Sequence, residues 1–234
     1  MTTTHEPPWT TGADDEVFRE SLRLASALEF TGEAGITSGS VDSLAWRHWT
    51  VAFATRLAAT SVDPGPFAGI ECGVADGTTA FFALRELQNR RSEHEFHLYD
   101  SWDEIPADSV SASEKFQAGR YGGLSRNLTE RNLAQFSSRV VWHEGLLPAS
   151  LARQPLPPDR VGYIHIDLNV AEPTRLVCEQ LWPRLARGGV ILFDDYGWLG
   201  FEDTKRVVDG FVDATTGALL LKMPTAQALL LKVR

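Results

Sequence analysis

The sequence predicts a doubly wound α/β fold with a mostly parallel sheet and an antiparallel last strand. From residue 67 onward, short apolar runs alternate with amphipathic stretches of helical length, which is the pattern of successive βαβ units. The chain has 234 residues and is 43% hydrophobic, enough for one large domain with a substantial core. The last run, residues 217–233, indicates two strands around a Pro-containing turn. With no helix between them these strands must form a hairpin, so one of them is antiparallel.

The elements follow in a regular order. Two helical patterns, 15–30 and 40–60, come first. Together with the polar N-terminal tail they are expected to form a separate helical cap made of residues 1–62. Residues 63–234 are predicted to form the sheet domain, and a long polar stretch, 101–123, is predicted to be a loop with a short helix near 114–118. Strands are predicted at 67–74, 95–100, 139–145, 161–168 and 189–195, and further helices at 78–91, 124–136, 173–186 and 201–215.

Charge and cysteine content exclude several classes of protein. The net charge of −9 and the lack of a basic patch argue against nucleic-acid and membrane-surface partners. Cys72 and Cys178 are isolated in core-like segments, so we expect no disulfide and a reducing cytoplasm. The N-terminus lacks the pattern of a signal peptide, and no apolar run has the length of a membrane span.

The first strand–turn–helix, IECGVADGTTA, suggests a nucleoside site. Glu71, Gly73 and Gly77 end the strand, and the following helix start offers free N–H groups to an anion. An ordinary tight turn is the alternative, because G-x-x-x-G is not the dinucleotide spacing. At the end of the second strand, Asp100 could accept bonds from ribose hydroxyls and Trp102 could stack on adenine. A capping acid and a core aromatic are the alternatives for these two.

Three acids end neighbouring strands further along the chain. Asp167 ends the fourth predicted strand, and Asp194 and Asp195 end the fifth, so all three should converge at one sheet edge. Three carboxylates at close range need a cation or raised pKa values, and a hard divalent ion such as Mg²⁺ or Ca²⁺ suits oxygen ligands. Capping explains one of the acids better than all three. His165 is expected to be a core residue, and His143 stays ambiguous.

These motifs together resemble those of class I S-adenosylmethionine-dependent methyltransferases, and most of all the macrocin O-methyltransferase family. The similar stretches are IECGVADGTTA, LYDSWDEIP, HEGLLPASL, IDLNVAEPT and LWPRLARGGVILFDDYGW. The resemblance implies a Rossmann-like methyltransferase sheet and an Mg²⁺-dependent enzyme that methylates a hydroxyl of a small natural product or its sugar, as in antibiotic tailoring. It places Mg²⁺ at Asp167, Asp194 and Asp195, the ribose of S-adenosylmethionine at Asp100 and its methionine part at Glu71 and Gly73. Asp76, Trp102 and Gly145 are further candidates for cofactor binding.

One position departs from the family pattern. Asn169 stands where the family has a second aspartate that acts as general base, and an amide cannot take a proton at neutral pH. A metal-bound hydroxyl, His143 or the loop 101–123, a candidate lid, could compensate. Alternatively the protein binds the cofactor without methyl transfer, or uses the metal for cyclisation or hydrolysis. An NAD-dependent oxidoreductase is the weakest alternative, because the first Gly turn has the wrong spacing.

The first helices carry two tryptophans whose role the sequence leaves open. Trp46 and Trp49 could pack in the core, line the acceptor pocket or form a dimer face, and core packing is the favoured interpretation. We expect a homodimer with a small hydroxylated acceptor as the partner molecule.

Overall fold

A computed structural model describes residues 13–62, 65–90, 94–153 and 160–234, so the predicted tail, residues 1–12, lies outside the described residues. The strands are β1 (Ala68–Cys72), β2 (Phe96–Asp100), β3 (Val140–Glu144), β4 (Val161–Ile166), β5 (Leu185–Phe193), β6 (Ala218–Lys222) and β7 (Ala228–Lys232). The helices are α1 (Ala13–Ala25), α2 (Ser40–Ser43), α3 (Ala45–Ser61), α4 (Thr78–Asn89), α5 (Arg126–Asn132), α6 (Ala149–Arg153), α7 (Ala171–Leu181) and α8 (Glu202–Asp213). Short 3-10 turns lie at Glu33–Gly35, Lys115–Gln117, Ala134–Phe136 and Trp182–Arg184.

The seven strands form one sheet in the order β3-β2-β1-β4-β5-β7-β6. β1 to β5 are parallel, whereas β7 runs antiparallel to both β5 and β6, so the predicted fold and its closing hairpin are confirmed. The chain moves outward from β1 to β3 and then returns to place β4 and β5 on the other side of β1. In such sheets the ligand lies at this reversal, beyond the carboxyl ends of the strands.

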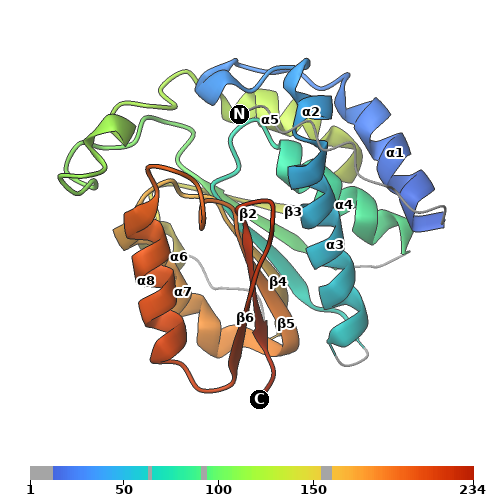
Figure 1. Cartoon of the computed structure of the whole chain (residues 1–234). Helices are drawn as coiled ribbons and strands as arrows, with labels where there is room; N and C mark the ends of the chain where they lie inside the picture. The colour runs from blue at the N-terminus through green and yellow to red at the C-terminus, as the bar shows by residue number, and fades with distance from the viewer. Residues whose placement is uncertain (1–12, 63–64, 91–93, 154–159) are drawn as a thin grey trace.

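Helices cover both faces of the sheet (Figure 1). One core lies under α1, α3 and α4 and contains Phe81, Phe82 and Leu84, while the other lies under α7 and α8 and contains Val177 and Val208. Each of these side chains is at most 1% exposed, as expected for helices that bury one apolar stripe against a sheet. Among the described residues, no helix has both the length and the apolar character needed to cross a membrane.

Some element boundaries differ from the predicted ones. The helix expected over 40–60 breaks at Leu44 into α2 and α3, and the one expected over 173–186 ends at Leu181, before the turn that contains Pro183. α6 was not predicted. Cys72 and Cys178 are buried free thiols, as expected.

Trp49 packs against the core, as the favoured interpretation expects: it is partly buried and stacks on Phe53 at 5.2 Å between ring centroids. Trp46 instead contacts Trp198, the residue that follows the DDYG segment by one position, at 5.7 Å. α3 packs against α4 and β5. The division of the chain near residue 62 stays a prediction.

Candidate active site

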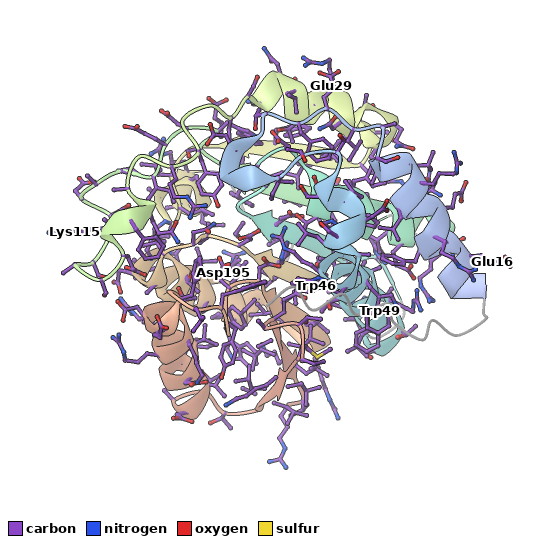
Figure 2. All side chains as sticks on the ribbon, turned by 45° about the horizontal axis from the view of Figure 1, so that its top comes forward. Glu16, Glu29, Trp46, Trp49, Lys115 and Asp195 are labelled. Atoms are coloured by element: carbon purple, nitrogen blue, oxygen red, sulfur yellow. The ribbon has the colours of Figure 1, made fainter. Side chains whose placement is uncertain are left out.

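A cavity of about 410 Å³ opens at the carboxyl ends of the parallel strands. Its walls come from the turns after β1 to β5, from α3 and its preceding turn, and from the segment 101–123. Figure 2 shows Asp195 in the middle of this edge, between Lys115 of that segment and Trp46 of α3. The volume lies in the usual range for small-molecule sites, and the position is the one that the strand order predicts.

One end of the cavity lies over β1, β2 and β3. Gly73, Asp100 and Gly145, which follow or end these strands, line it as the sequence predicts. Gly73 has a φ of +86°, and an added Cβ would overlap the carbonyl oxygen of Asp167, so only glycine fits here. Asp100 accepts backbone N–H bonds from Val74 at 2.6 Å and Ala75 at 2.8 Å. The acid therefore shapes the glycine turn, as the capping alternative expects, and also faces the cavity.

Three other predicted cofactor residues do not line the cavity. Glu71 is fully buried and accepts a 2.5 Å bond from Thr79, and Asp76 accepts the backbone N–H and the hydroxyl of Thr31. Trp102 is 7% exposed, and its indole N–H donates to the Thr129 hydroxyl at 3.0 Å. Tertiary partners hold all three side chains in the framework around the turn. Trp102 is packed in this framework, as its core alternative expects, and its stacking on adenine stays a prediction.

The three acids do converge at the other end of the cavity. β4 and β5 are neighbours in register, and the N–H of Asp194 donates to the carbonyl of Ile166 at 3.0 Å, which sets Asp167 and Asp194 side by side. Asp167, Asp194 and Asp195 all line the cavity. Ligand atoms of His165, Asp167 and Asp194 lie within 4.8 Å of one another.

A residue that the sequence reading missed joins this cluster. Arg47 of α3 places its Nη2 atom 2.5 Å from Asp167 Oδ2 and 2.7 Å from Asp194 Oδ2, and its Nε atom 2.8 Å from Asp194 Oδ2. Gln227, the residue before β7, donates to Asp194 Oδ1 at 2.8 Å. The available signal was composition: Arg47 is the single Asp, Glu, Lys or Arg between residues 43 and 55, a stretch otherwise dominated by apolar and aromatic residues.

The neighbours of each carboxylate give the three acids different proton affinities. Burial opposes the charge of Asp194, but Arg47 and His165 hold its pKa well below the usual range. Burial and the charge of Asp194 raise the pKa of Asp167 to about 6. Burial and the charges of Asp167 and Asp194 raise the pKa of Asp195 well above its usual value. The cluster therefore holds one acid, Asp194, that stays ionised at neutral pH, and two acids, Asp167 and Asp195, that accept protons more readily.

His165 is a core histidine with two acidic neighbours. Its ring is fully buried, with Nδ1 3.5 Å from Glu71 Oε1 and Nε2 3.6 Å from Asp194 Oδ1. Burial disfavours the charged ring, but these carboxylates outweigh it and raise the pKa of His165 to about 10. The imidazolium thus supports Asp194 from below the cavity floor, in agreement with the interpretation of His165 as a core residue.

The departure at Asn169 is visible in the cavity wall. Asn169 lines the cavity with a φ of +60°, and its Oδ1 atom accepts the hydroxyl proton of Tyr121 at 3.2 Å. Its Nδ2 atom is 3.5 Å from Asp167 Oδ1. The amide therefore ties the segment 101–123 to the acids. His143 is a buried residue of β3 with its Nε2 atom 2.8 Å from His97 Nδ1, and it does not line the cavity, so this structure does not place it beside a hydroxyl acceptor there.

The segment 101–123 is anchored rather than loose. It contains the 3-10 turn Lys115–Gln117, close to the predicted short helix. Glu114 is 4% exposed and accepts the N–H of Ala171 at the start of α7 at 2.7 Å. At the far end, Glu33 accepts the N–H groups of Tyr121 at 3.2 Å and Gly123 at 3.1 Å. The segment therefore forms a fixed wall of the cavity in this structure, and its opening as a lid stays a prediction.

His48, next to Arg47, gives the site a testable pH dependence. Burial and the charge of Arg47 lower the pKa of His48 to about 3. In the unfolded chain His48 takes up a proton near pH 6.5, whereas in the folded protein it stays neutral down to about pH 3. The free energy of unfolding therefore falls as pH drops from 6.5 toward 3. Between pH 7.5 and 5 we expect His48 to remove about 2 kcal/mol from the free energy of unfolding.

Urea unfolding of wild type and His48→Gln at both pH values measures this contribution. The variant should lose less stability on acidification than the wild type. His97, with a pKa lowered to about 4 by burial and by His143, titrates in the same direction in both proteins and cancels in the difference. An identical loss in both proteins would show that His48 is not held neutral.

Comparison with known proteins agrees with this geometry. A family model described as a methyltransferase domain matches residues 70–196, more than half of the chain. The O-methyltransferase NovP has a similar structure, with a TM-score of 0.76 at 15% identity, covering 94% of this chain and 100% of that one. The calicheamicin methyltransferase CalS11 gives a TM-score of 0.60 at 20% identity, covering 95% and 94% of the two chains.

At these identities the solved structures show the shared fold. No curated protein matches the sequence significantly. The family match spans the turn after β1, both acidic strand ends and most of the residues that line the cavity, although Arg47 and Trp198 lie outside it. The chain therefore belongs to the methyltransferase domain family, with the class I methyltransferase fold that its sequence predicts.

Proposed function

We propose that the protein transfers a methyl group from S-adenosylmethionine to a hydroxyl group of a small natural product or of its sugar. The observation that carries the proposal is the two-ended cavity, with Gly73 and Asp100 at one end and the acids of β4 and β5 at the other. O-methyltransferase NovP and calicheamicin methyltransferase CalS11, which share the fold over nearly the whole chain, support the choice of acceptor.

The cofactor end supplies positioning. The close approach permitted by Gly73 and the cavity-facing carboxylate of Asp100 suit the amino-acid and ribose parts of S-adenosylmethionine, respectively. When bound, this molecule supplies an electrophilic methyl group on a sulfonium centre. Orientation of donor and acceptor in one cavity accounts for several kcal/mol of barrier lowering, on the scale of about 7–11 kcal/mol for well-aligned reactants.

The acidic end supplies a proton acceptor. Asp167 has a side chain 18% exposed toward the cavity, and its pKa near 6 makes it a carboxylate that can take the hydroxyl proton as the oxygen attacks the methyl carbon. Asn169 cannot do this, but its Nδ2 atom lies 3.5 Å from Asp167 Oδ1 and its Oδ1 atom accepts the Tyr121 hydroxyl. We therefore assign the base role to Asp167, with Asn169 as a positioning residue.

The acceptor side is apolar above the acids. Trp198 and Phe201 line the cavity, and Trp198 is 41% exposed while it contacts Trp46. Such aromatic faces suit the apolar face of a sugar or a ring system. An antibiotic-tailoring role, a cytoplasmic location and a homodimer remain predictions from the sequence.

The predicted Mg²⁺ ion does not fit the acids in this arrangement, although the spacing of Asp167 and Asp194 alone would suit one. The guanidinium of Arg47 already contacts the facing oxygens of both acids. We therefore assign no step to a metal ion.

The experiment is a methyl-transfer assay with isotopically labelled S-adenosylmethionine and a panel of hydroxylated glycosides and sugar nucleotides, read by product mass. Asp167→Asn should keep cofactor affinity, measured by calorimetry, while turnover falls by about 10²–10⁴-fold. Asp213→Asn, an exposed acid on α8, should behave like wild type. Tight cofactor binding without transfer to any acceptor would favour a cofactor-binding protein instead.

A further inference from the structure

We propose that Arg47 is a built-in cation of the acidic cluster, and that the cluster holds this guanidinium in place of a divalent metal ion. The inference deepens the proposed function, on which it rests for its catalytic meaning, because it names what neutralises the acids beside the acceptor. The metal-binding behaviour it predicts can be measured without any substrate.

The hydrogen bonds of Asp194 carry the argument. Its Oδ2 atom accepts the Nε–H of Arg47 at 2.8 Å and lies 2.7 Å from Arg47 Nη2 in an ion pair, and its Oδ1 atom accepts the amide N–H of Gln227 at 2.8 Å. The ring Nε2 atom of His165 also lies 3.6 Å from this Oδ1 atom. A carboxylate has about four lone-pair positions, and N–H groups of three side chains already face them. Protein cations and donors therefore already engage both oxygens of Asp194.

Asp167 is shared with the same arginine. Its Oδ2 atom lies 2.5 Å from Arg47 Nη2, so one guanidinium spans the tips of β4 and β5. A metal ion that bridged these two oxygens would bring a double positive charge next to the guanidinium, which stays protonated in proteins. Two cations would then compete for one pair of oxygens, and the arginine, as part of helix α3, is already held beside them.

The packing of α3 keeps the Arg47 side chain at the acidic cluster. α3 packs against α4 and β5, and His48, the residue after Arg47, is 1% exposed. The side chain of Arg47 is itself only 12% exposed. Swinging it into solvent would break three short contacts and leave Asp167 and Asp194 as unpaired buried charges, which is costly. A planar fork suits two carboxylates at once, whereas a lysine ammonium offers only a point charge.

Asp195 identifies where a metal ion could enter if the arginine were removed. Its Oδ2 atom is buried without a hydrogen-bond partner, and the residue lines the same cavity as Asp167 and Asp194. Truncation of Arg47 would leave three carboxylates around a space vacated by a cation. Oxygen ligands in that number suit Mg²⁺ or Mn²⁺. The structure therefore predicts that loss of the arginine creates a metal site.

The test is calorimetric titration with Mn²⁺ of wild type, Arg47→Ala, Arg47→Lys and Arg56→Ala. Wild type and Arg47→Lys should bind no Mn²⁺ at the cluster. Arg47→Ala should bind one ion per chain, and should lose it when Asp167→Asn is added. Arg56 is the matched control, because it lies on the same helix and pairs with the buried Glu86, away from the cavity. Its truncation should create no metal site.

Thermal unfolding gives a second readout. Mn²⁺ should raise the melting temperature of Arg47→Ala and leave that of the wild type unchanged, since only a ligand of the folded state stabilises it. One Mn²⁺ bound to the wild type and lost in Asp194→Asn would overturn the proposal, even if Arg47→Ala did not fold. Absence of methyl transfer would contradict the proposed function and leave these metal-binding results intact.

Discussion

Asp194→Asn is expected to lower the free energy of unfolding by about 3–5 kcal/mol, the scale for removing one partner of a buried ion pair. The Asp194 side chain is 5% exposed and faces two cationic residues, Arg47 and His165. The amide keeps the shape of the carboxylate but loses its charge, so both cations remain buried with less compensation. Chemical denaturation near pH 7.5 measures the difference.

The adjacent residue provides the control. Asp195→Asn should be close to neutral or stabilising, because the Asp195 Oδ2 atom is buried without a partner and neighbouring carboxylates disfavour its charge. Glu179→Gln on α7 removes an exposed partner of Arg175 and should cost less than about 1 kcal/mol. Equal losses in the Asp194 and Asp195 variants would show that Arg47 and Gln227 do not single out Asp194.

Gly73→Ala is expected to destabilise the protein by at least about 3 kcal/mol and to abolish binding of S-adenosylmethionine. An alanine at a φ of +86° is strained, at a cost of about 1–2 kcal/mol, and its Cβ atom would overlap the backbone carbonyl of Asp167. β1 and β4 are paired in register at this level, so the overlap can be relieved only by moving the ends of both strands. Denaturation and calorimetry with the cofactor measure the two effects.

Gly210 is the matched control for this change. It lies within α8, and an added Cβ atom would meet nothing within 4 Å. Gly210→Ala should therefore stabilise the protein by about 0.5–1 kcal/mol, because alanine is the better helix former. A Gly73→Ala protein with wild-type stability and cofactor affinity would contradict the tight approach of the two strand ends.

Much of the architecture was encoded locally. The alternation of apolar runs and amphipathic stretches predicted the parallel strands, the helices between them and the closing hairpin, all of which are confirmed. The placement of acids at the ends of β4 and β5 also followed from the sequence, because parallel neighbours present their carboxyl ends at one edge. Gly73, Asp100 and Gly145 reached the cavity for the same reason.

Tertiary packing decided the rest of the site. Arg47 is 120 positions from Asp167 and 147 from Asp194, and nothing in the local pattern of α3 says which strand end the helix will cross. Thr31, 45 positions from Asp76, likewise donates to this predicted cofactor residue, which the sequence alone did not indicate. A sequence pattern fixes where strands end and which residues stand there. Whether those side chains face a ligand, the backbone or a cation depends on which distant element packs over them, because hydrogen bonds and ion pairs form between neighbours in space.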